Sequence, residues 1–275
     1  MNKFLESIKR YQKNKKALLA TNFYNAETLH AILMAAKREN SEVILQTSPA
    51  TLYYLGVDMA VAMVRAAANE HNVTAWLHLD HATDSALILQ CIKAGYDSVM
   101  VDASELEFSE NVQLTKEIVS AAHEKYIAVE AELGYIPKLG QSGVIESGLT
   151  TPKQAENFVS QTGIDLLAVA IGTAHGFYKE KPKLDFDRLK EIRNVTNIPL
   201  VLHGGSGLSH DEWQMAIQNG ICKINFATEI KDTFMKTIRN SMMESEEIDL
   251  RKVFLPGIET TAKLVESKIQ ICSMN

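Results

Sequence analysis

Short apolar runs alternate along the chain with longer segments in which apolar residues recur every three or four positions. Short runs of this kind are typical of buried parallel strands, and the wider spacing is typical of helices that bury one face. The runs predict these strands: Ala17–Thr21, Glu42–Gln46, Ala75–Asp80, Ser98–Asp102, Ala128–Leu133, Leu166–Ile171, Leu200–His203 and Cys222–Asn225. The wider spacing predicts these main helices: Glu27–Asn40, Asp58–His71, Ser85–Ala94, Asn111–Lys125, Pro152–Thr162, Asp187–Val195, Glu229–Met243 and Glu259–Ile269.

This alternation predicts an α/β protein built from right-handed parallel units. Eight strands in 275 residues fit a closed (β/α)8 barrel, the TIM barrel, better than an open sheet. No Pro-, Gly- or Ser-rich linker divides the pattern, so residues 1–275 are predicted to form one domain. The least regular stretch is Gly134–Leu149, which contains four glycines and a proline. A loop of this length inside a compact domain usually has a function.

The composition narrows the class of protein. Apolar residues make up 46% of the chain, charged residues 23%, and the formal net charge is −6. These values fit a soluble globular protein and, without a stripe of Lys or Arg, argue against nucleic acid as a partner. No segment has the roughly 20 apolar residues that a membrane span needs. The cysteines stand far apart, which indicates reduced thiols and a cytoplasmic protein, and the charged first 16 residues predict an amphipathic helix rather than a signal peptide.

Polar residues stand where several of the predicted strands end. They are Asp80, His81, Asp102, Glu130, Glu132, His175, His203 and Asn225. In barrels of this type the active site lies at the carboxyl ends of the strands. These side chains are therefore predicted to meet at one mouth of the barrel.

His81, His175 and His203 would bring three imidazoles from separate strands to this mouth. Three such ligands with a fourth position open are typical of catalytic zinc, and their wide separation in the chain excludes a finger-type structural site. A single histidine here would more often be a hydrogen-bonded core residue, but three of them favour a metal site.

The neighbouring carboxylates have more than one interpretation. Asp80 could act as a general base on a substrate hydroxyl, or it could orient His81 through a hydrogen bond. Asp102 and Glu132 could provide a second metal position or pair within the mouth. His78 faces the same side as Asp80 but lies deeper, which predicts a structural or supporting role.

Two turns rich in glycine and hydroxyl groups indicate an anion site. The sequence "HGGSG", His203–Gly207, follows the seventh strand, and "NFAT", Asn225–Thr228, opens the helix after the eighth. In TIM barrels these loops form the recurrent phosphate site, where backbone N–H groups and a helix N-terminus hold the anion. The residues thus predict a zinc-dependent barrel that acts on a phosphorylated substrate.

Several stretches resemble one enzyme family. They are "LHLDHATD", "SVMVDASELEFSENVQLTKEIV", "VEAELG", "TGIDLLAVAIGTAHGFY", "PLVLHGGSG" and "KINFATEI". Together they resemble the class II, zinc-dependent ketose-bisphosphate aldolases, which include fructose- and tagatose-bisphosphate aldolases. The resemblance extends from about Asn22 to Lys268. It implies a role in carbohydrate metabolism such as glycolysis, with reversible cleavage of a ketose 1,6-bisphosphate to dihydroxyacetone phosphate and glyceraldehyde 3-phosphate.

The resemblance also implies roles for individual residues. The implied Zn²⁺ ligands are His81, His175 and His203. Asp80 would be the catalytic acid/base, taking the C4 hydroxyl proton as the C3–C4 bond breaks while the ketose carbonyl lies on zinc. The implied pocket for the dihydroxyacetone phosphate half consists of Gly176, Gly204, Ser206, Asn225 and Thr228. The implied outer substrate contacts are Asn22 and Ser48 at the rim and Arg251 at the distal phosphate.

Two departures from the family pattern concern proton transfer and the ketose. Relatives usually carry a Gly-Gly stretch and a Glu-Asp pair after "AELG", whereas the loop "YIPKLGQSGVIES" has Glu146 as its only carboxylate. Glu146 is therefore the implied residue for moving the proton of dihydroxyacetone phosphate. Fructose-specific relatives often have Asp or Asn before the Thr of "NFAT", and Ala227 here slightly favours tagatose 1,6-bisphosphate.

Other functions stay open on the sequence alone. A Schiff-base aldolase would need a lysine at the mouth, but none ends the sixth strand, and Lys223 is predicted to point away from Asn225. The altered loop would suit a catalytically weak barrel that binds a sugar phosphate. The same chemistry could also act on another phosphorylated keto-sugar, such as the deoxy-keto-gluconate phosphate of inositol breakdown. The resemblance further implies a homodimer or homotetramer and activation by Na⁺ or K⁺.

Overall fold

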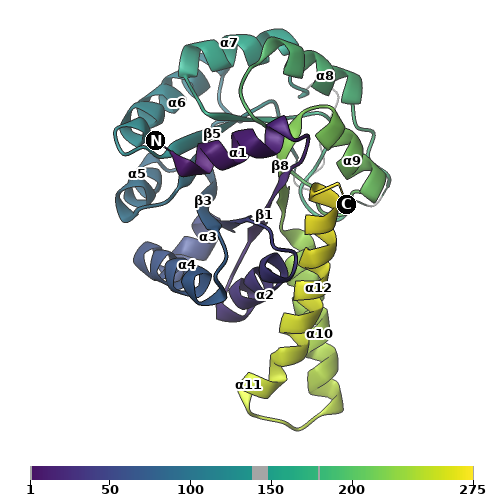
Figure 1. The fold of residues 1–275 in the computed structure, drawn as a ribbon. Helices are drawn as coiled ribbons and strands as arrows, with labels where there is room; N and C mark the ends of the chain where they lie inside the picture. Colours follow the sequence, from purple (N-terminus) through teal and green to yellow (C-terminus); the bar gives the residue numbers. More distant parts are fainter. Residues whose placement is uncertain (1, 138–147, 179, 275) are drawn as a thin grey trace.

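Eight parallel strands close into a barrel in sequence order, each paired with the next and the last with the first (Figure 1). The computed structural model describes residues 2–137, 148–178 and 180–274. The strands are β1 (Leu18–Asn22), β2 (Val43–Thr47), β3 (Ala75–Ala82), β4 (Ser98–Val101), β5 (Ala128–Leu133), β6 (Leu166–Val169), β7 (Leu200–Leu202) and β8 (Ile221–Phe226). The prediction of a (β/α)8 TIM barrel is confirmed.

Helices follow the strands around the outside of the barrel. The helices are α1 (Lys3–Lys13), α2 (Ala26–Arg38), α3 (Pro49–Leu55), α4 (Val57–His71), α5 (Ser85–Ala94), α6 (Phe108–His123), α7 (Pro152–Thr162), α8 (Phe186–Val195), α9 (His210–Gln218), α10 (Thr228–Glu244), α11 (Leu250–Val253) and α12 (Leu255–Cys272). Between helices and strands lies a large apolar core of buried side chains.

The predicted strands are all present, although several differ in length. β5 has the predicted bounds, whereas β4, β6 and β7 end before Asp102, Ile171 and His203. These residues stand just beyond the last paired position, because the chain leaves the sheet as it turns into the loop. The polar side chains of Asp102 and His203 therefore sit on the rim of the barrel, at its carboxyl end.

Three helices were not predicted: α3, α9 and α11. α3 and α11 have only 7 and 4 residues, too few for a helical period to show. α9 carries a local signal, since the side chains of Ser209 and Glu212 form a reciprocal capping box at its start. This Ser-x-x-Glu spacing is readable in the sequence and could have revealed the helix.

The amino-terminal helix α1 closes one end of the barrel (Figure 1). Phe4 and Ile8 are fully buried against Leu18, Ile44 and Leu166, which stand near the starts of their strands. This apolar plug fills the amino-terminal end of the barrel. The plug therefore blocks access to the barrel interior from this end.

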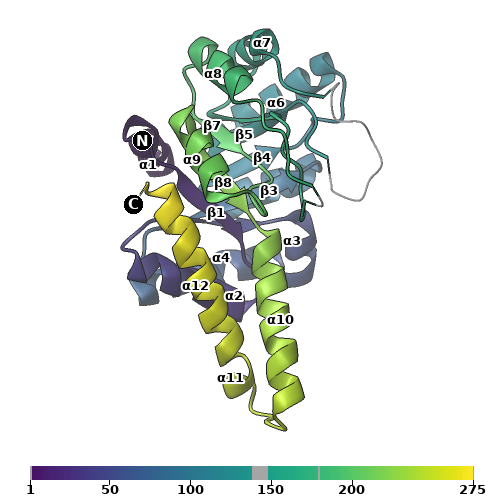
Figure 2. The same cartoon turned by 90° about the vertical axis from the view of Figure 1, so that its right-hand side faces the viewer.

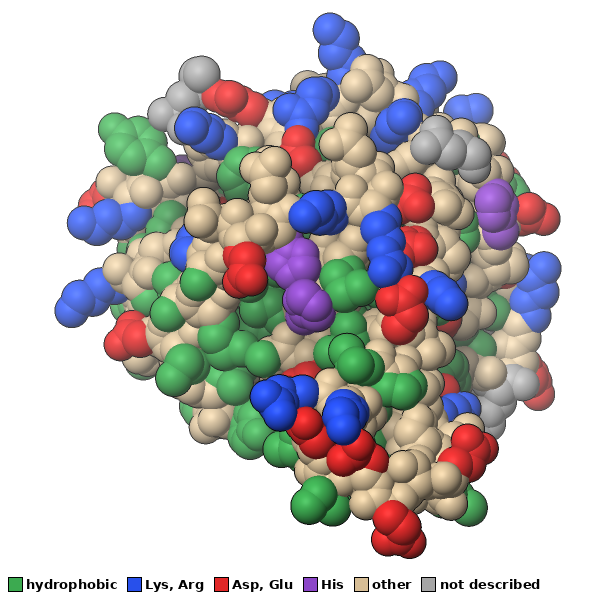
Figure 3. All heavy atoms as spheres, turned by 60° about the horizontal axis from the view of Figure 1, so that its bottom comes forward, with side chains coloured by type: hydrophobic (Ala, Val, Ile, Leu, Met, Phe, Trp, Pro, Cys, Tyr) green, Lys and Arg blue, Asp and Glu red, His purple; other side chains and the backbone are tan. Residues whose placement is uncertain are grey.

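Helices α10 and α12 run side by side and extend beyond the barrel, with α11 near their far ends (Figure 2). Apolar side chains are exposed on α10, α11, α12 and the segment that joins α10 to α11: Met242, Met243, Ile248, Leu250 and Leu255. Acidic and basic side chains are interspersed on the face in Figure 3.

Within the described parts of the chain, no helix is long and apolar enough to cross a membrane.

Candidate active site at the carboxyl end of the barrel

A pocket opens at the carboxyl end of the barrel, where most of the predicted site residues meet. Its lining comprises Asn22, Asp80, His81, His175, Gly176, Gly204, Ser206, Asn225, Ala227 and Thr228. These residues come from β1, β3, β8, α10 and the segments that follow β6 and β7. Backbone pairing around the closed barrel thus brings together side chains that are up to 206 residues apart in sequence, from Asn22 to Thr228.

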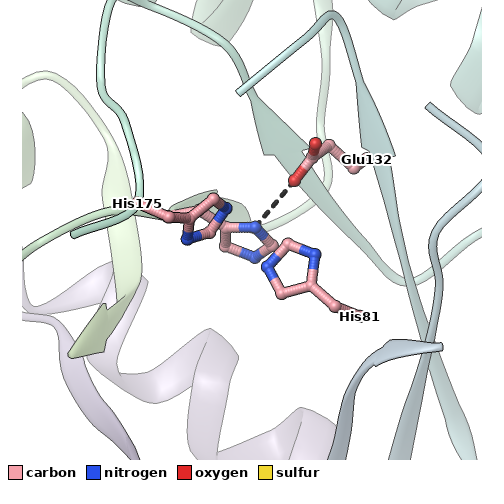
Figure 4. Close-up of side chains that lie close together, drawn as sticks. His81, Glu132 and His175 are labelled. Atoms are coloured by element: carbon pink, nitrogen blue, oxygen red, sulfur yellow. Dashed lines mark hydrogen bonds and ion pairs between the residues drawn. The ribbon is translucent and has the colours of Figure 1, made fainter. Parts of the chain in front are cut away.

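Three histidines and a glutamate form a compact cluster in the mouth (Figure 4). The ring centroid of His81 lies 4.7 Å from that of His175 and 4.6 Å from that of His203. The potential ligand atoms of these rings and of Glu132 all lie within 4.8 Å of one another. Nitrogen and oxygen donors at this separation suit a divalent transition metal such as zinc.

His81 is held in an uncommon backbone conformation at the end of β3. Its φ of 49° lies in the left-handed region, and the pairing of β3 with β4 shifts register beside it. Such backbone strain in a non-glycine residue clusters at functional sites. The turn directs the ring into the mouth, where Nδ1 bonds Oδ2 of Asp102 at 2.7 Å. The buried Nε2 has no hydrogen-bond partner among the residues that the structure describes.

His203 lies between two carboxylates and is fully buried. Its Nδ1 is 2.8 Å from Oε2 of Glu132, and its Nε2 is 2.9 Å from Oε1 of Glu130. Burial lowers the pKa of His203, but the hydrogen bonds to Glu130 and Glu132 outweigh it and raise the pKa to about 10. Glu132 also belongs to the metal cluster, so the Nδ1 side of the ring faces a site that attracts positive charge.

Lowered pKa values leave His175 neutral and Asp102 charged. Burial, with the nearby rings of His81 and His203, lowers the pKa of His175 to about 3, so this ring is neutral at neutral pH and its nitrogen lone pair is free. Burial would raise the pKa of Asp102, but the hydrogen bond to His81 holds it below its usual range. Asp102 therefore stays an anion that orients His81.

These residues fit a bound metal. The unpartnered, buried Nε2 of His81 is the kind of atom that a metal satisfies, and its partner Asp102 fixes which nitrogen is offered. In His203, the hydrogen bond from Nε2 to Glu130 leaves Nδ1 as the nitrogen that faces Glu132 and the rest of the cluster. Among the described residues Asp102 and Glu132 do not form a separate metal group, because Glu132 joins the histidine cluster and Asp102 bonds His81 and Ser104.

Asp80 stands beside the cluster and has amide partners. Its Oδ1 accepts hydrogen bonds from Nε2 of Gln46 and Nδ2 of Asn225, each at 3.0 Å, and lies 4.0 Å from Nε2 of His81. Burial would raise the pKa of Asp80, but electrostatic interactions with the nearby His81, His203 and Lys223 outweigh it and lower the pKa. Asp80 is therefore an anion that can accept a proton.

The two turns predicted to hold phosphate lie on one side of the pocket. Gly204 has a φ of 70°, and a Cβ there would overlap the carbonyl of Ala174, so only glycine fits. The hydroxyl of Ser206 accepts hydrogen bonds from the backbone N–H groups of Ala227 at 3.3 Å and Thr228 at 3.1 Å. This contact joins the turn after β7 to the N-terminus of the 17-residue helix α10, whose dipole favours an anion.

Two predicted substrate-binding residues, Ser48 and Arg251, are not among the residues that line this pocket. Ser48 caps α3, its hydroxyl accepting from the backbone N–H of Thr51 at 3.3 Å. Arg251 lies on α11, with a side chain 90% exposed and paired with Asp249, near the far end of the helical pair (Figure 2). Glu146 lies outside the described residues.

The structure corrects the prediction for Lys223. Residues two apart on a strand share a face, and Lys223 and Asn225 both point into the barrel, with 2.9 Å between Nζ and Oδ1. Lys223 is fully buried and also bonds Glu130, so a substrate carbonyl cannot reach it to form a Schiff base. Gln46 was missed as well, although a glutamine in the apolar run "VILQT" is a readable signal.

His78 lies deeper than Asp80, as the strand alternation predicts. Its ring is fully buried, Nδ1 bonds Oγ of Ser98 at 2.9 Å, and Nε2 lies 3.9 Å from Glu130. Burial lowers the pKa of His78 to about 3, which keeps the ring neutral. His78 is not among the residues that line the pocket.

Comparison with known proteins identifies the family. A family model described as class-II fructose-bisphosphate aldolase matches residues 2–275. The chain belongs to this family. The YdjI aldolase of Escherichia coli K12 is 31% identical, with 97% of this chain and 95% of that chain covered and a TM-score of 0.84. A protein of Coccidioides immitis, provisionally assigned as a fructose-1,6-bisphosphate aldolase, is 30% identical, with 98% and 96% covered and a TM-score of 0.90.

A third similar structure, the fructose-bisphosphate aldolase of Campylobacter jejuni, is 22% identical and has the same fold, with a TM-score of 0.84 over 98% of this chain and 94% of that chain. The class II family is metal-dependent in general and cleaves sugar phosphates by aldol chemistry. This protein is therefore a carbon–carbon lyase, and its His/Glu cluster is a candidate metal site within it.

Proposed function

We propose that this aldolase catalyses the zinc-dependent, reversible cleavage of a ketose 1,6-bisphosphate, either tagatose or fructose 1,6-bisphosphate. The products would be dihydroxyacetone phosphate and glyceraldehyde 3-phosphate. The observation that carries the proposal is the meeting of His81, His175 and His203 next to the carboxylate of Asp80. A metal site and a general base side by side are the two groups that cleavage beside a carbonyl requires.

The metal would be held by the three imidazoles and Glu132. Bound zinc would act there as a Lewis acid for the carbonyl at C2 of the ketose. Asp102 and Glu130 keep two of the rings in a fixed orientation through their outer nitrogens. The low pKa of His175, about 3, supports a ligand that needs no deprotonation at neutral pH.

Asp80 would move the proton at the bond that breaks. Its anionic carboxylate lines the pocket and would accept the C4 hydroxyl proton as the C3–C4 bond breaks. The electrons of the C4 oxygen form the aldehyde carbonyl, and the electron pair of the broken bond stays on C3 of the dihydroxyacetone phosphate half. That carbon takes up a proton before release, for which Glu146 stays the proposed donor, and synthesis runs through the same steps in reverse.

The phosphate of the dihydroxyacetone half would bind beside Ser206 and the N-terminus of α10. Gly176 and Gly204, both at positive φ, keep this side of the pocket free of side chains, so backbone can approach the anion closely. Asn22 lines the pocket from β1, the strand that pairs with β8, and would contact the sugar hydroxyls. Asn225 would lie close to C2 and C3 because it bonds Asp80.

The ketose and the distal phosphate are less constrained by the pocket. Ala227 lines it and supports the tagatose sugar, as the sequence pattern suggests. Arg251 is remote from the pocket of its own chain, so a contact with the distal phosphate would need the mouth of a second copy. The exposed apolar side chains on α10, α11 and α12 support the homodimer or homotetramer that such a contact requires.

A coupled cleavage assay tests this proposal. Fructose 1,6-bisphosphate and tagatose 1,6-bisphosphate are supplied separately, each with and without a chelator and with zinc added back. We expect cleavage that the chelator abolishes and zinc restores, and the ratio of the two kcat/KM values then identifies the ketose. Failure on both sugars with zinc bound would overturn the ketose assignment and direct the search to other phosphorylated keto-sugars.

A further inference from the structure

A fully buried charged pair lies beneath the pocket. Nζ of Lys223 on β8 donates a hydrogen bond to Oε2 of Glu130 on β5 at 2.8 Å, and neither side chain has any exposed surface. A buried ion pair gains little stability over apolar residues of the same size, because both charges must be removed from water. The pair is therefore expected to serve a purpose other than stability.

The ammonium group of Lys223 also donates to Oδ1 of Asn225 at 2.9 Å. A side-chain amide has an oxygen that only accepts and a nitrogen that only donates, and its two orientations differ by a half-turn. In the opposite orientation the NH2 group of Asn225 would face an ammonium group and its oxygen would face the carboxylate of Asp80. Both contacts are repulsive, so Lys223 selects one orientation of the amide.

The selected orientation determines how Asp80 is held. Nδ2 of Asn225 donates to Oδ1 of Asp80 at 3.0 Å, and Nε2 of Gln46 donates to the same oxygen at 3.0 Å. Within the described parts of the chain, Oδ2 of Asp80 makes no hydrogen bond. One carboxylate oxygen is thus fixed by two amides, and the other is free in a residue that lines the pocket.

We propose that Lys223 is a positioning residue, which orients the amide of Asn225 so that Oδ1 of Asp80 is fixed and Oδ2 accepts the substrate proton. Glu130 holds the lysine in place and at the same time bonds Nε2 of His203, so one buried carboxylate supports both the base and the metal ligands. This inference rests on the proposed role of Asp80 as the general base.

The test is a double-mutant cycle between Lys223 and Asn225. Lys223→Met keeps the chain length but removes the charge and the donors. With zinc content unchanged, we expect it to lower kcat by about 10–100-fold, part of the effect of a general base, and to change KM by less than about 3-fold. In an Asn225→Ala background the same substitution should lower kcat further by less than about 3-fold, since its effect passes through the amide.

An equal loss of kcat in both backgrounds would overturn the proposal, because Lys223 would then act independently of Asn225. Lys236→Met is the matched control, since Lys236 is 69% exposed on α10 and pairs with Asp232 on the same helix. Lys223→Met leaves Glu130 buried without its partner. If that variant fails to fold, Lys223→Met/Glu130→Gln removes both charges, and wild-type kcat in it would equally overturn the proposal.

A readout independent of catalysis separates this inference from the proposed function. In the wild type the NH2 group of Asn225 is hydrogen-bonded to Asp80, so its NMR signals should exchange slowly with solvent. We expect that exchange to accelerate at least about 10-fold in Lys223→Met. Unchanged exchange would refute the orientation role even if neither ketose were cleaved by the wild type.

Discussion

Oδ2 of Asp102 lies 2.7 Å from Nδ1 of His81, and this contact determines which nitrogen of His81 is offered to the mouth of the barrel. His81 is turned into the mouth by a left-handed backbone conformation. With Nδ1 bonded to a carboxylate, the ring has one lone pair left, on the buried Nε2. The hydrogen bond between Asp102 and His81 thus fixes both the tautomer and the orientation of a proposed metal ligand.

Asp102→Ala should weaken metal binding without removing a ligand. We expect the affinity for zinc to fall by about 10–100-fold, as for other lost carboxylate partners of metal-binding histidines. Competition with a chelator of known affinity measures it. Asp165→Ala is the control, because Asp165 bonds Nε2 of His123 at 2.9 Å outside the site, and its zinc affinity should match the wild type. Equal affinities for all three proteins would contradict the role given to Asp102.

His175→Ala should remove one metal ligand without leaving a buried charge, because the ring of His175 is neutral at neutral pH. We expect the purified variant to lose zinc and cleavage activity together while its circular dichroism spectrum stays that of the wild type. Elemental analysis of the metal and the cleavage assay measure the two quantities on one sample. Full zinc occupancy in a folded variant would show that His175 is not a ligand.

Gly204→Ala should disrupt the proposed phosphate side of the pocket, because the added Cβ would overlap the carbonyl of Ala174. We expect KM for the ketose to rise by at least about 10-fold, the effect of losing roughly 1.4 kcal/mol of binding. Gly95→Ala is the matched control, since Gly95 also has a positive φ, of 91°, but has no atom within 4 Å of the added Cβ. Both variants carry backbone strain, and only Gly204→Ala should change KM.

The side chain of Asp185 caps α8 by accepting from the backbone N–H of Arg188 at 2.9 Å. This hydrogen bond lowers the pKa of Asp185, so its stabilisation is complete above the unfolded pKa of about 3.9 and is lost as pH falls through the lower folded value. Asp185→Ala should therefore lower the free energy of unfolding by about 0.5–2 kcal/mol at pH 7 and by less at pH 3. Denaturant titrations at both pH values measure the difference. The same loss at both pH values would contradict the ionised cap.

The sequence predicted the barrel well because strand and helix periods are local properties. Buried parallel strands are continuous apolar runs, and Ala128–Leu133 is readable as a strand even though it contains two glutamates. The metal cluster was also predictable, since residues that end the strands of a barrel share one mouth. Short elements such as α3 carry too few residues for a period, and they were missed.

The contacts beneath the pocket were not predictable in the same way. Lys223 and Glu130 are 93 residues apart, and their contact depends on the register of every strand pair between β5 and β8. The side of β8 on which Lys223 lies, however, follows from strand alternation alone. Lys223 and Asn225 are two residues apart and share a face, so the prediction that Lys223 points away was a misapplication of this rule. For Arg251 the resemblance gave a role, but the place of α11 relative to the mouth depends on how the helical pair leaves the barrel.

We propose that a zinc site and the carboxylate of Asp80 together cleave a ketose 1,6-bisphosphate. The most direct measurement compares the kcat of the wild type with that of Asp80→Ala, with both proteins at equal, measured zinc occupancy. We expect Asp80→Ala to keep its zinc and to lose about 10²–10⁴-fold in kcat, the usual contribution of a general base. A variant with full zinc and wild-type turnover would contradict the account.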